Sequence, residues 1–164
     1  MICAVLLAAG AATRFGSPKQ RLLLPAVLDR VRASSVDDVV VVMGAHEVET
    51  HARVVRCDEW ERGIGASLRC GLRSLRDEVE AAVVVLADGP RLAPEAVDRV
   101  IAAWRETGEE VVAATYNGVR LHPVLLARTA WARVPDEGAR SLPAYLVACD
   151  DLGVPGDVDR LEDL

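Results

Sequence analysis

The sequence is poor in aromatic residues, which make up 4% of its 164 residues, and it has no excess of positive charge. Val, Leu and Ala must therefore build most of the core of a chain that is 51% apolar. The formal net charge of −6 argues against a nucleic-acid-binding surface, because a phosphate backbone favours clustered Lys and Arg. A nucleoside triphosphate is not excluded, because backbone amides, a metal ion and one or two cations suffice to hold it.

Long apolar runs and cysteine motifs are also missing. No stretch approaches membrane-spanning length, so we expect no membrane partner. The start of the chain lacks the basic segment and cleavage site of a signal peptide, so we expect a cytoplasmic protein. The cysteines show neither a CxxC pair nor zinc-like spacing, which predicts separate apolar thiols in a reducing compartment. They are Cys3, Cys57, Cys70 and Cys149.

Three apolar runs have the length of a strand and almost no polar interruption. They are Ile2–Ala8, Val39–Met43 and Ala82–Ala87. Continuous β-branched runs suit strands that are buried on both faces, as in a parallel sheet. A weaker run over Glu110–Thr115 predicts a fourth strand.

Apolar residues at helical spacing lie between these runs, and Pro94 is well placed for the first turn of one helix. The stripes are Val27 and Val31, then Leu68, Leu72 and Leu75, then Val97, Val100, Ile101 and Trp104. Alternating strands and helices predict an α/β fold with a mostly parallel sheet and helices on both faces. No linker divides the chain, so we expect one domain over residues 1–164.

Two of the predicted strands end at segments that suit ligand binding. In open α/β sheets the ligand lies beyond the carboxyl ends of the strands. After the first strand comes a loop with Gly10, Arg14, Gly16 and Lys19, whose exposed amides and cations could hold phosphates. Its spacing matches neither GxGxxG nor GxxxxGK[ST], so an ordinary strand-to-helix turn with two surface cations is an equal alternative. The missing GxGxxG also disfavours a dinucleotide-dependent oxidoreductase.

Carboxylates follow the third strand and end the chain. Asp88 comes directly after the apolar run, where a hard cation could also touch phosphate oxygens, although a helix cap or turn is the common role of such a residue. Asp157 and Asp159 are one residue apart and could face the same side of an extended segment. A solvated acidic tail explains them equally well, since Glu162 and Asp163 follow.

The loop Leu7-Ala-Ala-Gly-Ala-Ala-Thr-Arg-Phe-Gly-Ser-Pro-Lys-Gln20 resembles the signature loop of the NTP transferases related to the molybdenum-cofactor nucleotidyltransferases. Later segments are similar to further landmarks of that family, so the resemblance spans essentially the whole chain. They are Val41–His46, Gly63–Arg69, Leu86–Pro90, His122–Leu125, Asp136–Arg140 and Asp157–Leu164.

This resemblance implies a single-domain, Rossmann-like three-layer sandwich of the nucleotide-diphospho-sugar transferase type. Arg14 and Lys19 would hold the triphosphate as catalytic residues, and Asp88 and Asp159 would bind Mg²⁺, the implied cofactor. Residues implied to line the nucleotide are Leu7, Ala8, Ala9, Gly10, Gly65 and Ser67. Ser67 could equally cap the helix that follows it. His122 would position the acceptor, although a lone histidine is more often structural.

The implied reaction is attack by an acceptor phosphate on the α-phosphorus of an NTP, which releases pyrophosphate. The Ala9-Gly10 form of the loop accompanies CTP users in the family, which favours a molybdenum cofactor cytidylyltransferase acting on molybdopterin. Two alternatives are a cytidylyl- or guanylyltransferase acting on a sugar or other metabolite phosphate, and a non-catalytic nucleotide-binding partner of a molybdoenzyme.

The sequence departs from the family pattern in three places. The helix after Pro25 is expected to begin almost at once, at Ala26. The segment from Arg140 to Asp157 is short, which leaves little room for the usual last strand. Unusual residues also stand around Asp88 and before His122. They are Gly89, Arg91 and Leu121.

Overall fold

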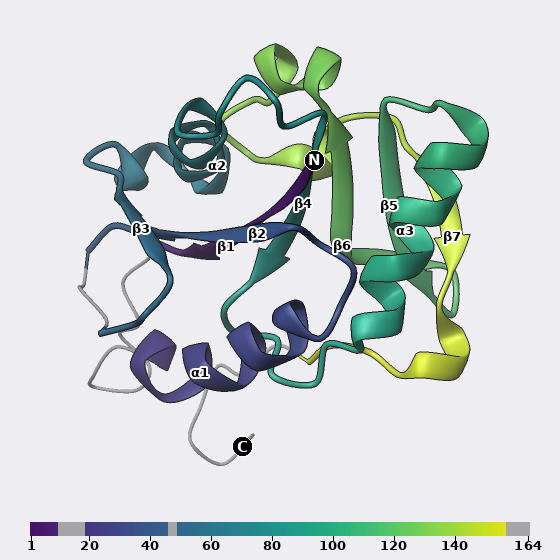
Figure 1. The fold of residues 1–164 in the computed structure, drawn as a ribbon, viewed down its shortest axis with the longest axis horizontal. Coiled ribbons are helices and arrows are strands. Elements are labelled where there is room, and N and C mark those ends of the chain that lie inside the picture. Colours follow the sequence, from purple (N-terminus) through teal and green to yellow (C-terminus); the bar gives the residue numbers. More distant parts are fainter. Residues whose placement is uncertain (10–18, 46–48, 157–164) are drawn as a thin grey trace.

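The computed structural model describes residues 1–9, 19–45 and 49–156, without the side chains of residues 19–22. Within them, seven strands form one sheet in the order β3-β2-β1-β4-β6-β5-β7 (Figure 1). All neighbours are parallel except β6, which runs antiparallel to both β4 and β5. The strands are β1 (Ile2–Ala8), β2 (Asp38–Met43), β3 (Arg53–Arg56), β4 (Ala81–Leu86), β5 (Val111–Tyr116), β6 (Val119–Ala127) and β7 (Tyr145–Ala148).

Helices cover both faces of the sheet, which makes three layers. One core cluster joins the sheet to α1 (Lys19–Arg32) and α3 (Pro94–Thr107), and a second joins its other face to α2 (Ile64–Arg73). Figure 1 shows α1 and α2 on opposite sides of β1 and β2. Short 3-10 turns complete the described part. They are η2 (Trp60–Arg62), η3 (Arg128–Arg133), η4 (Ala139–Ser141) and η5 (Asp150–Leu152).

The predicted α/β architecture and all four predicted strands are confirmed, with ends that differ by at most one residue. The continuous apolar runs form the centre of the sheet, and every residue of β1 is buried. The core-facing stripes predicted from helical spacing lie in the two buried clusters.

Two expectations about departures from the family pattern were wrong. A last strand is present, because the four residues of β7 are enough to pair with β5, from Val112 with Tyr145 to Thr115 with Ala148. The first helix does not start at Ala26 but begins at Lys19 and carries Pro25 inside it. Pro25 is exposed, while Leu24 and Val27 beside it are almost fully buried. The burial of Leu24 and Val27 compensates for the backbone hydrogen bond that Pro25, which has no N–H group, cannot donate.

The prediction of four separate thiols was also wrong. Cys57 and Cys70 form a disulfide with their Cα atoms 5.8 Å apart, whereas Cys3 and Cys149 are buried free thiols. Cys57 follows β3, and α2 returns across the same face of the sheet. This crossover brings together two residues that are 13 apart in sequence, which their spacing alone did not reveal.

In the described part of the chain, none of the helices combines the length and the apolar character that a membrane span requires.

Candidate functional site

The carboxyl ends of β1, β2 and β4 lie side by side at one edge of the sheet. Leu7 of β1 pairs with the last residue of β4, and its carbonyl accepts a hydrogen bond from the amide of Ala87 at 3.0 Å. Asp88 therefore follows β4 beside the end of β1, where Ala8 is the last residue of the strand and Ala9 leaves the sheet. The structure thus brings three predicted nucleotide residues next to the predicted metal ligand.

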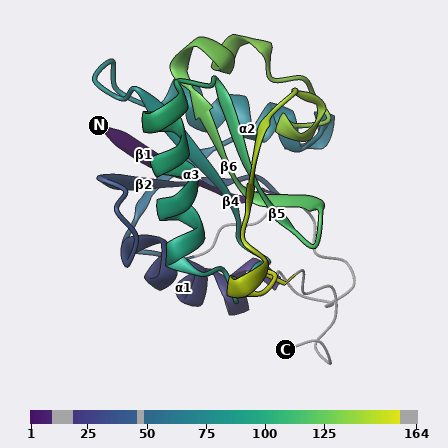
Figure 2. The same cartoon turned by 90° about the vertical axis from the view of Figure 1, so that its right-hand side faces the viewer.

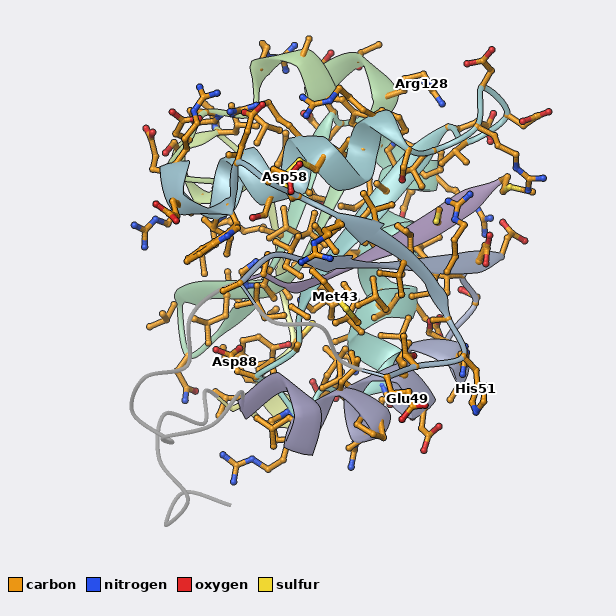
Figure 3. All side chains as sticks on the ribbon, turned by 90° about the vertical axis from the view of Figure 1, so that its left-hand side faces the viewer. Met43, Glu49, His51, Asp58, Asp88 and Arg128 are labelled. Carbon is orange, nitrogen blue, oxygen red and sulfur yellow. A yellow bond between two sulfur atoms is a disulfide. The ribbon has the colours of Figure 1, made fainter. Side chains whose placement is uncertain are left out.

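Asp88 is half-buried in the turn between β4 and α3. Figure 3 shows it between the sheet and α1. The turn is held by its own backbone, since the amide of Gly89 donates to Leu86 and that of Leu92 donates to Gly89. The position of the carboxylate is therefore set by the end of a buried strand and a hydrogen-bonded turn.

A cavity of about 290 Å³ opens beside Asp88. Its walls come from β4 and the following turn, from the start of β6, and from the segment of residues 154–156. The lining residues are Val85, Leu86, Asp88, Gly89, Leu92, Leu121, His122, Val154, Pro155 and Gly156. Asp88 and His122, which are far apart in sequence and were assigned to metal and acceptor, therefore share one cavity.

His122 reaches this cavity because β6 runs antiparallel to β4. Val84 pairs with Val124, and continuing this register by two residues places His122 beside Leu86. The hydroxyl of Tyr116 donates to the backbone carbonyl of His122 at 3.0 Å. Burial, helped by the guanidinium of Arg120, lowers the pKa of His122 to about 4, so its imidazole is neutral at neutral pH.

The amino end of α2 lies at the same edge of the sheet. Gly63 occupies the N-cap position, so the alternative of Ser67 as a helix cap was wrong. A Cβ at Gly71 would lie 2.7 Å from side-chain atoms of Val5 and Val42, which shows that this face of α2 packs directly on β1 and β2. Ser67 lies one turn earlier on that face. It is 1% exposed, and within the described residues its hydroxyl has no hydrogen-bond partner.

The backbone of Pro135 and Asp136 clamps the first turn of α2, which the sequence reasoning missed. The amide of Gly65 donates to the carbonyl of Asp136 at 2.8 Å, and a Cβ at Gly65 would lie 1.6 Å from the carbonyl oxygen of Pro135. Arg69 donates to the carbonyl of Val134 at 2.8 Å and pairs with the Asp136 carboxylate. Arg69 and Asp136 both lie in segments that resemble family landmarks, but the sequence contains no pattern that indicates their contact.

Some predicted site residues lie outside the described residues. These are Gly10, Arg14 and Asp159, together with the side chain of Lys19, whose backbone begins α1. Gly156, three residues before Asp159, lines the cavity with Asp88. In residues 1–9, 19–45 and 49–156, no three His, Cys, Asp or Glu side chains converge as a metal site. The proposed roles of the individual site residues therefore remain predictions.

Comparison with known proteins identifies the class. The family described as "MobA-like NTP transferase domain" matches residues 4–149. The structure of Rv0371c from Mycobacterium tuberculosis H37Rv is 29% identical, with a TM-score of 0.82 over 99% of this chain and 94% of that one. A structure of Rv0371c in complex with manganese, from the same organism, is 26% identical, with a TM-score of 0.78 over 99% and 95% of the two chains.

A bifunctional protein GlmU from Sorangium cellulosum (strain So ce56) is 28% identical over 132 residues. The match covers 68% of this chain but only 28% of that relative. The fold is that of a nucleotidyltransferase domain. The chain belongs to the MobA-like NTP transferase domain family.

Proposed function

We propose that this chain is a divalent-metal-dependent cytidylyltransferase that transfers CMP from CTP to a phosphorylated small molecule. The main support is the position of Asp88, at the end of β4 between two sub-sites. The end of β1 lies on one side of it, and the cavity with His122 lies on the other. We assign the nucleotide to the β1 side and the acceptor to the cavity, with the molybdenum cofactor as the first acceptor to test.

The nucleotide half of the site consists of small residues and one buried hydroxyl. Leu7, Ala8, Ala9 and Gly10 would approach the base and ribose closely. The Ser67 hydroxyl is buried on the face of α2 that packs on β1 and β2, has no hydrogen-bond partner within the described residues, and would bond to the base. A buried hydroxyl without a partner costs stability, which a ligand hydrogen bond would recover. Gly65 would act through packing, since its amide is already bonded to Asp136.

Asp88 fits a divalent cation by the chemistry of its donor atoms. Mg²⁺ is commonly held by one or two carboxylates together with substrate phosphates, and Asp159 would be the second carboxylate. The manganese complex of the mycobacterial relative supports a divalent ion in this fold. When bound, the ion would offset negative charge on the phosphates that react.

The reaction needs positioning more than a strong base. A phosphate oxygen of the acceptor would form a bond to the α-phosphorus of CTP, and the bond from that phosphorus to pyrophosphate would break. The acceptor phosphate is already ionised at neutral pH, so no side chain has to remove its proton. Arg14 and Lys19 would offset the charge that grows on the leaving pyrophosphate.

This proposal is tested by measuring pyrophosphate release from each of the four NTPs. The assay contains Mg²⁺ or Mn²⁺ and the molybdenum cofactor. We expect CTP to be preferred and Asp88→Asn to lower kcat/KM by at least about a hundredfold, the order of one lost electrostatic contact. Asp77→Asn, at an exposed aspartate in the loop before β4, is the matched control and should leave turnover unchanged. Equal turnover in the Asp88 variant would reject the assigned role of Asp88.

A further inference from the structure

The disulfide between Cys57 and Cys70 ties the edge of the sheet to α2, across the segment predicted to close around the nucleotide. Figure 1 shows the chain running from β3, at the edge of the sheet, to α2. The amide of Cys57 donates to the carbonyl of Met43 at 2.7 Å, which fixes this cysteine to the end of β2. Its sulfur lies 3.6 Å from the carbonyl oxygen of Ala66. The disulfide therefore contacts the segment Gly63–Ser67 directly.

A second restraint holds the same segment at its start. The amide of Gly65 donates to the carbonyl of Asp136 at 2.8 Å. Cys70 follows Ser67 by three residues on α2, so the disulfide holds the helical turn that carries the buried Ser67 hydroxyl. Opening the disulfide removes one of these two restraints and leaves the amino end of α2 freer to move.

The two sulfur atoms of the disulfide differ in their surroundings. Cys57 is fully buried, whereas Cys70 is half-buried on α2. Nη2 of Arg73, an exposed residue one turn further along the helix, lies 3.6 Å from the sulfur of Cys70. A partly accessible sulfur beside a cation is typical of reactive cysteines, because the positive charge stabilises the thiolate. A thiolate from solution can therefore reach Cys70 but not Cys57.

A dithiol would open this bond in two exchange steps. Its first thiolate attacks the sulfur of Cys70, the bond to Cys57 breaks, and Cys57 leaves as a thiolate that takes up a proton. The second thiol of the reductant, as a thiolate, then attacks the reductant's own sulfur in the mixed disulfide and releases Cys70 as a thiolate beside Arg73. Two electrons pass to the protein, and the dithiol becomes a disulfide.

We propose that the Cys57–Cys70 disulfide is a redox switch of the Gly63–Ser67 segment, which binds nucleotide tightly when the bond is closed and weakly when a dithiol has opened it. A freed segment has to be ordered again when the nucleotide binds, and this cost lowers the affinity by about tenfold. The inference rests on the proposed function for the identity of the ligand, but not for the opening of the bond or its effect on the segment.

The test compares the closed and the opened form of the full chain. CTP with Mg²⁺ is titrated by calorimetry into the oxidised protein, into the protein treated with dithiothreitol under native conditions, and into Cys57→Ala/Cys70→Ala. We expect the Kd for CTP to rise about tenfold in the treated protein. The double variant should bind CTP as weakly as the treated protein, and its Kd should not respond to dithiothreitol.

Two further measurements need no CTP. Thiol titration of the folded chain follows the opening by dithiothreitol, and Arg73→Gln should slow it about threefold, because the cation that attracts the attacking thiolate and stabilises the Cys70 thiolate is lost. Arg105→Gln, in the last turn of α3 as Arg73 is in the last turn of α2, is the matched control and should leave the rate unchanged. Amide hydrogen exchange of Gly63–Ser67 should accelerate on opening by more than that of β1, which reports global unfolding.

The outcomes separate the switch from the proposed function. Equal CTP affinity in the two redox forms, or a bond that dithiothreitol opens only after unfolding, would overturn the switch and leave the transferase proposal intact. If CTP does not bind even to the oxidised chain, the transferase proposal fails. Faster exchange of Gly63–Ser67 on opening would then still support the redox switch of this segment, and unchanged exchange would overturn it.

Discussion

His122 is a histidine whose surroundings keep it uncharged. Its pKa is lowered to about 4, first by burial and then by the nearby guanidinium of Arg120. A neutral imidazole can donate or accept one hydrogen bond in the cavity, but it does not attract a phosphate as a cation would. This agrees with the proposed role of His122 in positioning the acceptor.

The lowered pKa of His122 predicts a loss of stability in mild acid. The unfolded histidine has a pKa of 6.5, so between pH 6.5 and 4 the unfolded chain binds a proton that the folded chain does not. The free energy of unfolding therefore falls as the pH drops through this window, by about 2 to 3 kcal/mol between pH 7.5 and 4.5. Urea unfolding of the wild type and of His122→Gln at both pH values measures it.

The variant should lack this part of the pH dependence. The lowered pKa values of Asp136 and Asp151 act in the same direction, but the stability that these carboxylates add is lost only as the pH falls through and below their ordinary pKa of 3.8. If the wild type and His122→Gln lose the same free energy between the two pH values, the assignment to His122 is wrong.

At the scale of elements, α2 is held at both ends and along its length. Its first turn is clamped by the backbone of Pro135 and Asp136. In its last turn Gly71 packs on β1 and β2, and Cys70 is joined through Cys57 to the end of β3. The segment enclosed by the disulfide contains Gly63–Ser67, the part predicted to close around the nucleotide. The fold therefore fixes this segment before any ligand binds.

Reduction of the disulfide should lower the free energy of unfolding by about 3 kcal/mol, because a loop of 13 residues then becomes free in the unfolded chain. Denaturant unfolding with and without reductant measures this, and the double variant Cys57→Ala/Cys70→Ala should not respond to reductant. In the denatured protein, two thiols should react before reduction and all four cysteines after it. Four reactive thiols without reductant would contradict the disulfide.

At the scale of the whole molecule, the order of the strands in the sheet determines which elements surround Asp88 in the candidate site. β4 lies between β1, which leads into the loop of small residues, and β6, which starts at the cavity. Figure 2 shows η5 and the segment after it close to the start of α3, where Arg99 pairs with Asp151 and the amide of Arg91 donates to Pro155. Elements from the start, middle and end of the described chain thus meet around Asp88.

Nucleotide binding should stabilise the whole chain. A ligand present at a hundred times its Kd adds about 2.7 kcal/mol to the free energy of unfolding, which raises Tm by about 5 to 10 °C in a domain of this size. We expect this shift with CTP and Mg²⁺ or Mn²⁺ in thermal unfolding, a smaller one with GTP, and almost none in Asp88→Asn. A shift of the same size in Asp88→Asn would show that binding does not depend on this carboxylate.

Local hydrophobic patterns in the sequence predicted the central strands of the sheet but not its edge strands. The apolar runs of β1, β2 and β4 were evident because strands buried on both faces need unbroken apolar sequence. β3 and β7 are short edge strands with mostly exposed residues, so composition did not mark them. β6 was recognised only as a family landmark, because its place between β4 and β5 depends on partners distant in sequence.

The sequence by itself determined the class of this protein. The positions of Leu7–Ala9 and of Asp88 after buried strands were enough to predict the ligand edge, because parallel strands end at the same side of a sheet. Only the tertiary structure decided that His122 shares a cavity with Asp88, that Cys57 bonds to Cys70, and that Pro135 and Asp136 clamp α2. These contacts join residues from different elements, and their geometry exists only once the sheet and its crossovers have formed.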